Sequence, residues 1–285
     1  MERVHWIAQP AALRDPVLIV ALEGFVDAGS VASSAAMFLR HRWKSEPVAR
    51  FDRDAFLDLR ARRPTAVIDG GRMRRLDWPD LEVLAAKVPE AERDVLFLIG
   101  PEPDMRWHAF VEEVAHLAQR LGVTHLIGLG AYPAAAPHTR PTEIVAAENA
   151  VAEGLAPDVP RVKGYTGPVG ADLALHVALA ERGIPSVGLW AEVPHYIAQN
   201  PYPPGSLAMV RLLSDLLGVT LDTTELESAA ALHREQVDEA VAESEEAAEV
   251  VQALEEQADA GDDDEDDVPS GDDLAQEIER YLRDT

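Results

Sequence analysis

Short apolar runs alternate along the chain with longer stretches in which apolar residues recur at helical spacing. Runs such as "VLFLI" lack the apolar–polar alternation of half-buried strands, so they are typical of strands buried on both faces. Strands that alternate with amphipathic helices predict an α/β fold with a largely parallel sheet. The predicted strands are residues 17–22, 47–52, 65–69, 94–100, 125–130, 143–147 and 186–193.

Two stretches between these strands have clear helical signals. Residues 106–122 place their apolar side chains on one helical face and end at Gly122, while residues 170–183 end at Gly183. This alternation predicts a three-layer α/β body over residues 1–218.

The character of the chain changes after Gly218. Residues 219–260 are rich in Ala and Glu and predict one long helix or a helix pair, whose narrow stripe of mostly small residues docks on the body or on a sister subunit. Residues 261–273 predict an acidic, disordered linker. Residues 274–285 predict a short amphipathic helix, and its apolar stripe is a candidate docking surface for a partner: Leu274, Ile278, Tyr281 and Leu282.

The formal net charge of −26 is concentrated in this C-terminal part. Residues 222–285 hold 24 Asp and Glu against three Arg, so the preceding 221 residues carry a net charge of only −5. An acidic tail argues against nucleic-acid binding, which requires clustered Lys and Arg. The chain has no cysteine, no apolar signal core and no run long enough to span a membrane, and we therefore expect a cytoplasmic protein.

The stretch "VLIVALEGFVDAGSVASSAAMFLR" has the outline of a phosphate-binding loop, because Gly24, Gly29 and Ser30 follow an apolar strand. The lysine of that motif is missing, and the loop carries Glu23 and Asp27 instead, which would repel a polyphosphate. Two interpretations remain open. Asp27 caps the following helix while the glycines permit a tight turn, or the loop forms a shallow polar site for a small ligand.

Polar residues also follow two later strands. His195 stands in the proline- and aromatic-rich segment "VPHYIAQNPYPP", and His138 and Arg140 follow a glycine-rich strand end. Because open α/β sheets bind ligands beyond the carboxyl ends of their strands, these residues are candidates for ligand binding, with His138 and Arg140 suited to an anion. The competing interpretation is that they only close their loops.

No catalytic machinery is recognisable. His108 and His116 would stand about 12 Å apart along one helix, too far to share a metal ion. There is no G-x-S-x-G nucleophile elbow and no dinucleotide-binding fingerprint. We therefore expect no catalytic residue, cofactor or metal site.

Four segments in this order resemble the bacterial branch of the proteasome assembly chaperone 2 family. They are "ALEGFVDAGSVASSAAMFL", "GLGAYPA" with "HTRPTEIVA", "GPVGADLAL", and "GIPSVGLWAEVPHYIAQNPYPPGSLAMVRLLSDLLG". The resemblance implies a Rossmann-like α/β fold akin to nucleoside phosphorylases and an action by protein contact in proteasome assembly. It also implies self-association, and Gly24, Asp27 and Gly29 match the family pattern as residues that shape the loop.

Two functions follow as expectations. The first is a non-catalytic, assembly-chaperone-like protein that contacts a protein partner such as proteasome subunits and forms a homo-oligomer through its α/β body. The alternative is a protein that binds a nucleoside or phosphate in a phosphorylase-like site. The candidate ligand-binding residues are Glu23, Gly24, Asp27, Gly29, His138, Arg140 and His195.

Overall fold

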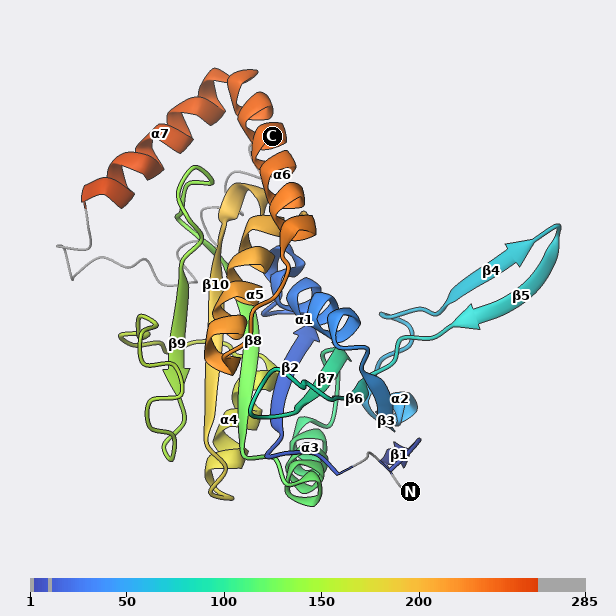
Figure 1. Cartoon of the computed structure of the whole chain (residues 1–285). Coiled ribbons are helices and arrows are strands. Elements are labelled where there is room, and N and C mark those ends of the chain that lie inside the picture. The colour runs from blue at the N-terminus through green and yellow to red at the C-terminus, as the bar shows by residue number, and fades with distance from the viewer. Residues whose placement is uncertain (1–2, 10–11, 261–285) are drawn as a thin grey trace.

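The computed structural model describes residues 3–9 and 12–260 of the 285-residue chain (Figure 1). Its strands are β1 (Val4–Trp6), β2 (Val17–Glu23), β3 (Glu46–Phe51), β4 (Thr65–Asp69), β5 (Arg72–Asp77), β6 (Glu82–Ala86), β7 (Val95–Pro101), β8 (His125–Ala134), β9 (Ile144–Glu148) and β10 (Ser186–Pro194). Its α-helices are α1 (Val31–Arg42), α2 (Arg53–Phe56), α3 (Trp107–Leu121), α4 (Ala171–Ala180), α5 (Pro203–Leu217), α6 (Thr224–Ala242) and α7 (Glu245–Ala260). Two short 3₁₀ turns, Ala28–Ser30 and His195–Ile197, precede α1 and follow β10.

Eight strands form the main sheet in the order β1-β3-β6-β7-β2-β8-β10-β9. The four central strands β7, β2, β8 and β10 are parallel, whereas every pairing outside them is antiparallel. The prediction of a largely parallel sheet therefore holds for the centre and is wrong for both edges. The central strands are the ones buried on both faces, which parallel sheets require.

Helices cover both faces of this sheet, so the predicted three-layer α/β architecture is confirmed. Successive residues of β2 point to opposite faces: Val17 and Ile19 pack in a core with α1 and α5, and Leu18 and Val20 pack in a second core with α3 and α4. The carboxyl ends of the parallel strands meet at the upper edge in Figure 1.

One predicted strand lies outside the main sheet. Residues 65–69 form β4, which pairs only with β5 in a separate hairpin that projects from the body (Figure 1). Gly70 and Gly71 both have positive φ and make the tight turn between the two strands. The apolar run was correctly assigned as a strand, but its flanking arginines belong to an exposed arm rather than to a buried layer.

The extension after Gly218 is a helix pair. The chain breaks between α6 and α7 at Ser244, whose hydroxyl accepts a hydrogen bond from the Ala247 amide and so caps α7. The extension contacts the body of the same chain through Asp238, Glu255 and Asp259, and Val251 and Leu254 of α7 are buried, whereas α6 has no buried residue. The predictions for residues 261–273 and for Leu274, Ile278, Tyr281 and Leu282 lie outside the described residues.

Candidate functional site at the carboxyl edge of the sheet

The loop after β2 is shaped by Asp27. Its Oδ1 accepts hydrogen bonds from the Ala32 amide (2.8 Å) and the Ser33 amide (3.3 Å), in the first turn of α1. Burial raises the pKa of Asp27 to about 6, against the lowering effect of these hydrogen bonds, and the nearby Glu23 carboxylate raises it further. In this structure the Asp27 carboxylate accepts hydrogen bonds from the first turn of α1, which agrees with the capping interpretation.

Gly29 joins this loop to the segment after β10. Its amide donates to the Ala198 carbonyl and its carbonyl accepts from the Tyr202 amide, both at 2.8 Å. Gly29 has a φ of +60°, and a Cβ atom built on it would lie 2.7 Å from the Tyr202 Cβ. Only glycine fits this close approach of two backbones.

His138 is 4% exposed and lies between the body and α6. Its Nδ1 lies 2.7 Å from the Tyr196 hydroxyl, and its Nε2 lies 3.0 Å from Oδ1 of Asp238 on α6. Tyr202, a few residues further along, stacks edge-on against His233 of α6 and accepts a hydrogen bond from the Thr142 hydroxyl. The imidazole proposed from the sequence as an anion ligand therefore already faces a carboxylate of the same chain.

Arg140 is engaged in the same way by α7. Its guanidinium donates from Nη2 to both carboxylate oxygens of Asp259 (3.0 and 2.8 Å) and from Nε to Oδ1, and its Nη1 lies 3.6 Å from Glu255. The Thr139 hydroxyl donates to the Glu255 carboxylate. These partners raise the pKa of Arg140, with the Asp259 hydrogen bond as the largest cause.

The remaining candidates are more loosely placed. His195 is exposed, and its Nδ1 lies 3.3 Å from the Ala134 carbonyl at the end of β8. Glu23 is an exposed residue at the end of β2, and its carbonyl accepts from the Glu102 amide. The structure thus brings His138 and Arg140 together under α6 and α7 and links Gly29 to the neighbouring loop, while Glu23 and His195 stay at the solvent-exposed rim.

Sequence reasoning missed Glu102 and did not predict the burial of Asp172, two carboxylates at the same edge. Glu102, directly after β7, accepts hydrogen bonds from the Ala171 amide (2.7 Å) and the Phe25 amide (3.3 Å), and its side chain packs against Gly24. Asp172 in the first turn of α4 is 2% exposed, and neither of its oxygens has a hydrogen-bonding partner of good geometry among the described residues. Burial, followed by the charge of Glu102, raises the pKa of Asp172 to about 6.

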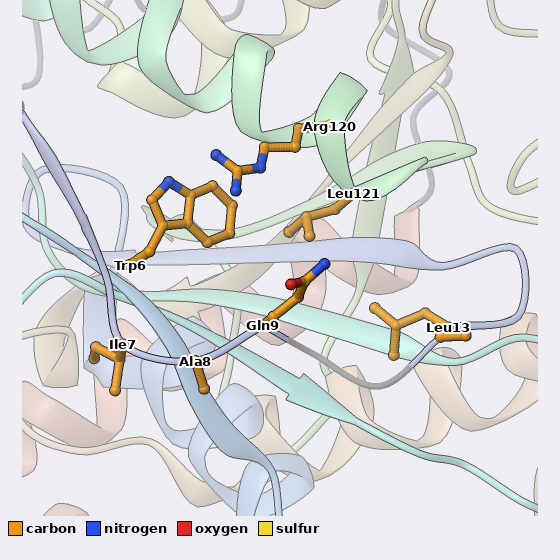
Figure 2. A pocket seen from close by; sticks show the side chains of 8 residues that line it. Trp6, Ile7, Ala8, Gln9, Leu13, Arg120 and Leu121 are labelled. Atoms are coloured by element: carbon orange, nitrogen blue, oxygen red, sulfur yellow. The ribbon is translucent and has the colours of Figure 1, made fainter.

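A cavity of about 430 Å³ lies elsewhere, at the amino end of the parallel strands (Figure 2). The Arg120 guanidinium stacks over the Trp6 ring there, with its carbon 3.9 Å from the ring centroid. None of the candidate ligand-binding residues lines this cavity, so the cavity is separate from the candidate site at the carboxyl edge. Its lining is Trp6, Ile7, Ala8, Gln9, Ala12, Leu13, Arg120 and Leu121.

The arrangement defines a three-layer α/β protein in which an acidic helical extension of the same chain contacts His138 and Arg140, beyond the carboxyl ends of the parallel strands. The chain belongs to the PAC2 family, whose model matches residues 21–241. This confirms the resemblance drawn from the sequence motifs. No curated protein matches the chain.

Several solved structures share the fold over most of their length. A Corynebacterium glutamicum protein of unknown function is 31% identical with a TM-score of 0.83, covering 91% of this chain and 98% of that one. A Mycobacterium tuberculosis proteasome-assembly chaperone homologue is 33% identical with a TM-score of 0.75, covering 82% and 99%. A PAC2 family protein from Streptomyces avermitilis is 36% identical with a TM-score of 0.73, covering 83% and 100%.

Two features are absent from the described residues, 3–9 and 12–260. No group of three or more His, Asp or Glu side chains there is arranged to hold a metal ion. Among the described helices, none combines the length and the apolar character needed to cross a membrane.

Proposed function

We propose that this protein acts through protein contact, as a non-catalytic assembly chaperone linked to proteasome assembly, and that it works in the cytoplasm as a homo-oligomer. Similarity to a proteasome-assembly chaperone homologue over 82% of the chain supports the chaperone-like role. We infer that its partners are proteasome subunits and that it carries out no catalytic step.

The observation that carries the proposal is the engagement of His138 and Arg140. Open α/β sheets bind small ligands beyond the carboxyl ends of their strands. At this edge the His138 imidazole and the Arg140 guanidinium contact carboxylates of α6 and α7, namely Asp238 and Asp259. An anionic ligand would have to displace these helices, whereas a protein partner can use the surface that the helices present.

A two-arm experiment tests the proposal. Purified full-length protein is mixed with 20S proteasome subunits of its own organism, and particle formation is followed by native gel electrophoresis. We expect faster or more complete assembly and a co-migrating complex. The second arm is a thermal-shift series with nucleosides, inorganic phosphate and ATP, in which a ligand at 100 times its Kd adds about 2.7 kcal/mol of stability. A clear shift with a nucleoside or phosphate, together with unchanged assembly, would replace the proposal with small-molecule binding.

A further inference from the structure

The hairpin arm, defined as residues 60–77, lies outside the main sheet, and its two strands pair only with each other. It contains β4 and β5 and projects away from the sheet (Figure 1). Ten of the eleven residues in its two strands are exposed. Because an isolated two-stranded hairpin is marginal in water, a contact with another surface would stabilise the arm.

The arm combines apolar and basic side chains. The register pairs Ala66 with Leu76 and Ile68 with Met73, and paired residues of this kind share one face of the hairpin. On that face Ile68 is 63% exposed, Met73 69% and Leu76 41%. The arm also holds six arginines and only two carboxylates: Arg60, Arg62, Arg63, Arg72, Arg74 and Arg75, against Asp69 and Asp77.

The opposite charge lies on the outer surface of α6 and α7. Residues 224–260 hold twelve carboxylates and a single arginine, and three of the carboxylates, Asp238, Glu255 and Asp259, contact the body instead. Leu232 of α6 is 55% exposed, with Glu235 and Glu239 one and two turns further along the same face. Val250 of α7 is 42% exposed, one turn after Glu246. This surface therefore has exposed apolar side chains surrounded by acidic ones, which complements the apolar and basic side chains of the arm.

We propose that the arm of one copy docks on the outer surface of α6 and α7 of a second copy. The apolar face of the hairpin covers the region of Leu232, and the arginines reach past the narrow edges of the hairpin to the surrounding glutamates. Within one chain the arm points away from both helices, so the contact joins different molecules (Figure 1). Such a contact uses two different surfaces, and repeated copies close into a ring when the rotation between them allows it.

Two matched charge reversals test the proposal in the full-length protein by sedimentation velocity. The first variant carries Arg72→Glu, Arg74→Glu and Arg75→Glu in the arm, and the second carries Glu235→Lys and Glu239→Lys in α6. We expect the wild type to self-associate, and each variant alone to dissociate at least tenfold more readily. Mixing the two variants restores association, because the unchanged arm of the second variant meets the unchanged helices of the first and the reversed arm of the first meets the reversed helix of the second.

Three controls separate this contact from general charge effects. Glu90→Lys with Glu92→Lys makes the same charge change as the α6 variant, but in the loop between β6 and β7, and leaves association unchanged. Ile68→Ser with Met73→Ser keeps every charge yet weakens association. Raising the salt concentration from about 50 mM to about 500 mM weakens wild-type association, because the charges are screened.

The proposal is overturned by any of three results: a monomeric wild type, a reversed variant that associates like the wild type, or a mixture that fails to associate. Thermal melting followed by circular dichroism checks that each variant is folded. The changed residues are exposed, so their melting temperatures should match that of the wild type.

Discussion

Nε2 of His138 lies 3.0 Å from Oδ1 of Asp238, across one hundred residues of sequence. The imidazole is almost fully buried in the body, whereas the carboxylate on α6 is 54% exposed. The contact therefore anchors the helical extension from the body side, and its partner on α6 remains within reach of water. The Tyr196 hydroxyl fixes the other ring nitrogen and so orients the ring toward the helix.

A double-mutant cycle measures this anchor. We expect Asp238→Ala to lower the free energy of unfolding by less than about 1 kcal/mol, because the carboxylate is half exposed. His138→Ala should cost about 1–3 kcal/mol, since it also removes the partner of Tyr196 in a buried site. The coupling free energy between the two changes should be about 0.5–1 kcal/mol by chemical denaturation. Glu239→Ala, one residue further along α6, is the control, and a coupling as large for this residue would show that the anchor is not specific.

Arg140 is expected to hold α7 against the body. In Arg140→Ala the carboxylates of Asp259 and Glu255 lose their cation, so hydrogen exchange of the amides of residues 245–260 should accelerate while those of α5 keep their protection. Arg182→Ala removes an ion pair between the turn after α4 and Glu112 of α3, and serves as the control. Unchanged exchange in α7 would mean that the apolar contacts of Val251 and Leu254 alone hold the helix.

Gly29→Ala should destabilise the fold by about 2 kcal/mol, because a Cβ atom meets Tyr202 at 2.7 Å and the residue must keep a positive φ. Gly122→Ala is a matched control at the end of α3. Gly122 has a similar φ of +69°, yet nothing lies within 4 Å of the position that a Cβ atom would take there. Thermal unfolding of the two variants separates crowding from backbone strain, and equal losses would remove the crowding argument.

The sequence predicted the parallel centre of the sheet because its strands are continuous apolar runs that only a doubly covered sheet can bury. It misplaced residues 65–69, since an apolar run reveals a strand but not the sheet that the strand joins. His138 and Arg140 were identified as residues suited to an anion, and the anions that they bind are carboxylates of α6 and α7. Those partners are 100 and 119 residues away in sequence, and local spacing carries no information about such contacts.

Asp172 illustrates a second limit of local patterns. Its position at the start of a helix predicts a carboxylate that complements the helix dipole, and α4 does begin there. Its burial depends on the loop before α4 and on Glu102, which come from other parts of the fold. Burial, with no hydrogen-bonding partner of good geometry among the described residues, raises the pKa of this carboxylate to about 6. Its contribution to stability is therefore fully present below the unfolded pKa of about 4 and is lost as the pH rises through about 6.

Asp172→Asn should consequently stabilise the protein at pH 7.5. The amide keeps the shape of the side chain and removes the buried charge, for an expected gain of about 1–2 kcal/mol in the free energy of unfolding. The gain should shrink as the pH falls from about 6 to about 4, where the wild-type carboxyl is protonated.

Asp94→Asn is the contrasting control. Burial would raise the pKa of Asp94, but hydrogen bonds from Arg14 and Lys87 outweigh it and hold that pKa well below its usual range, so this change should destabilise the protein at pH 7.5. Urea unfolding of the three proteins across this pH range provides the measurement. A loss of stability for Asp172→Asn at pH 7.5 would show that the Asp172 carboxylate makes favourable contacts in its charged form.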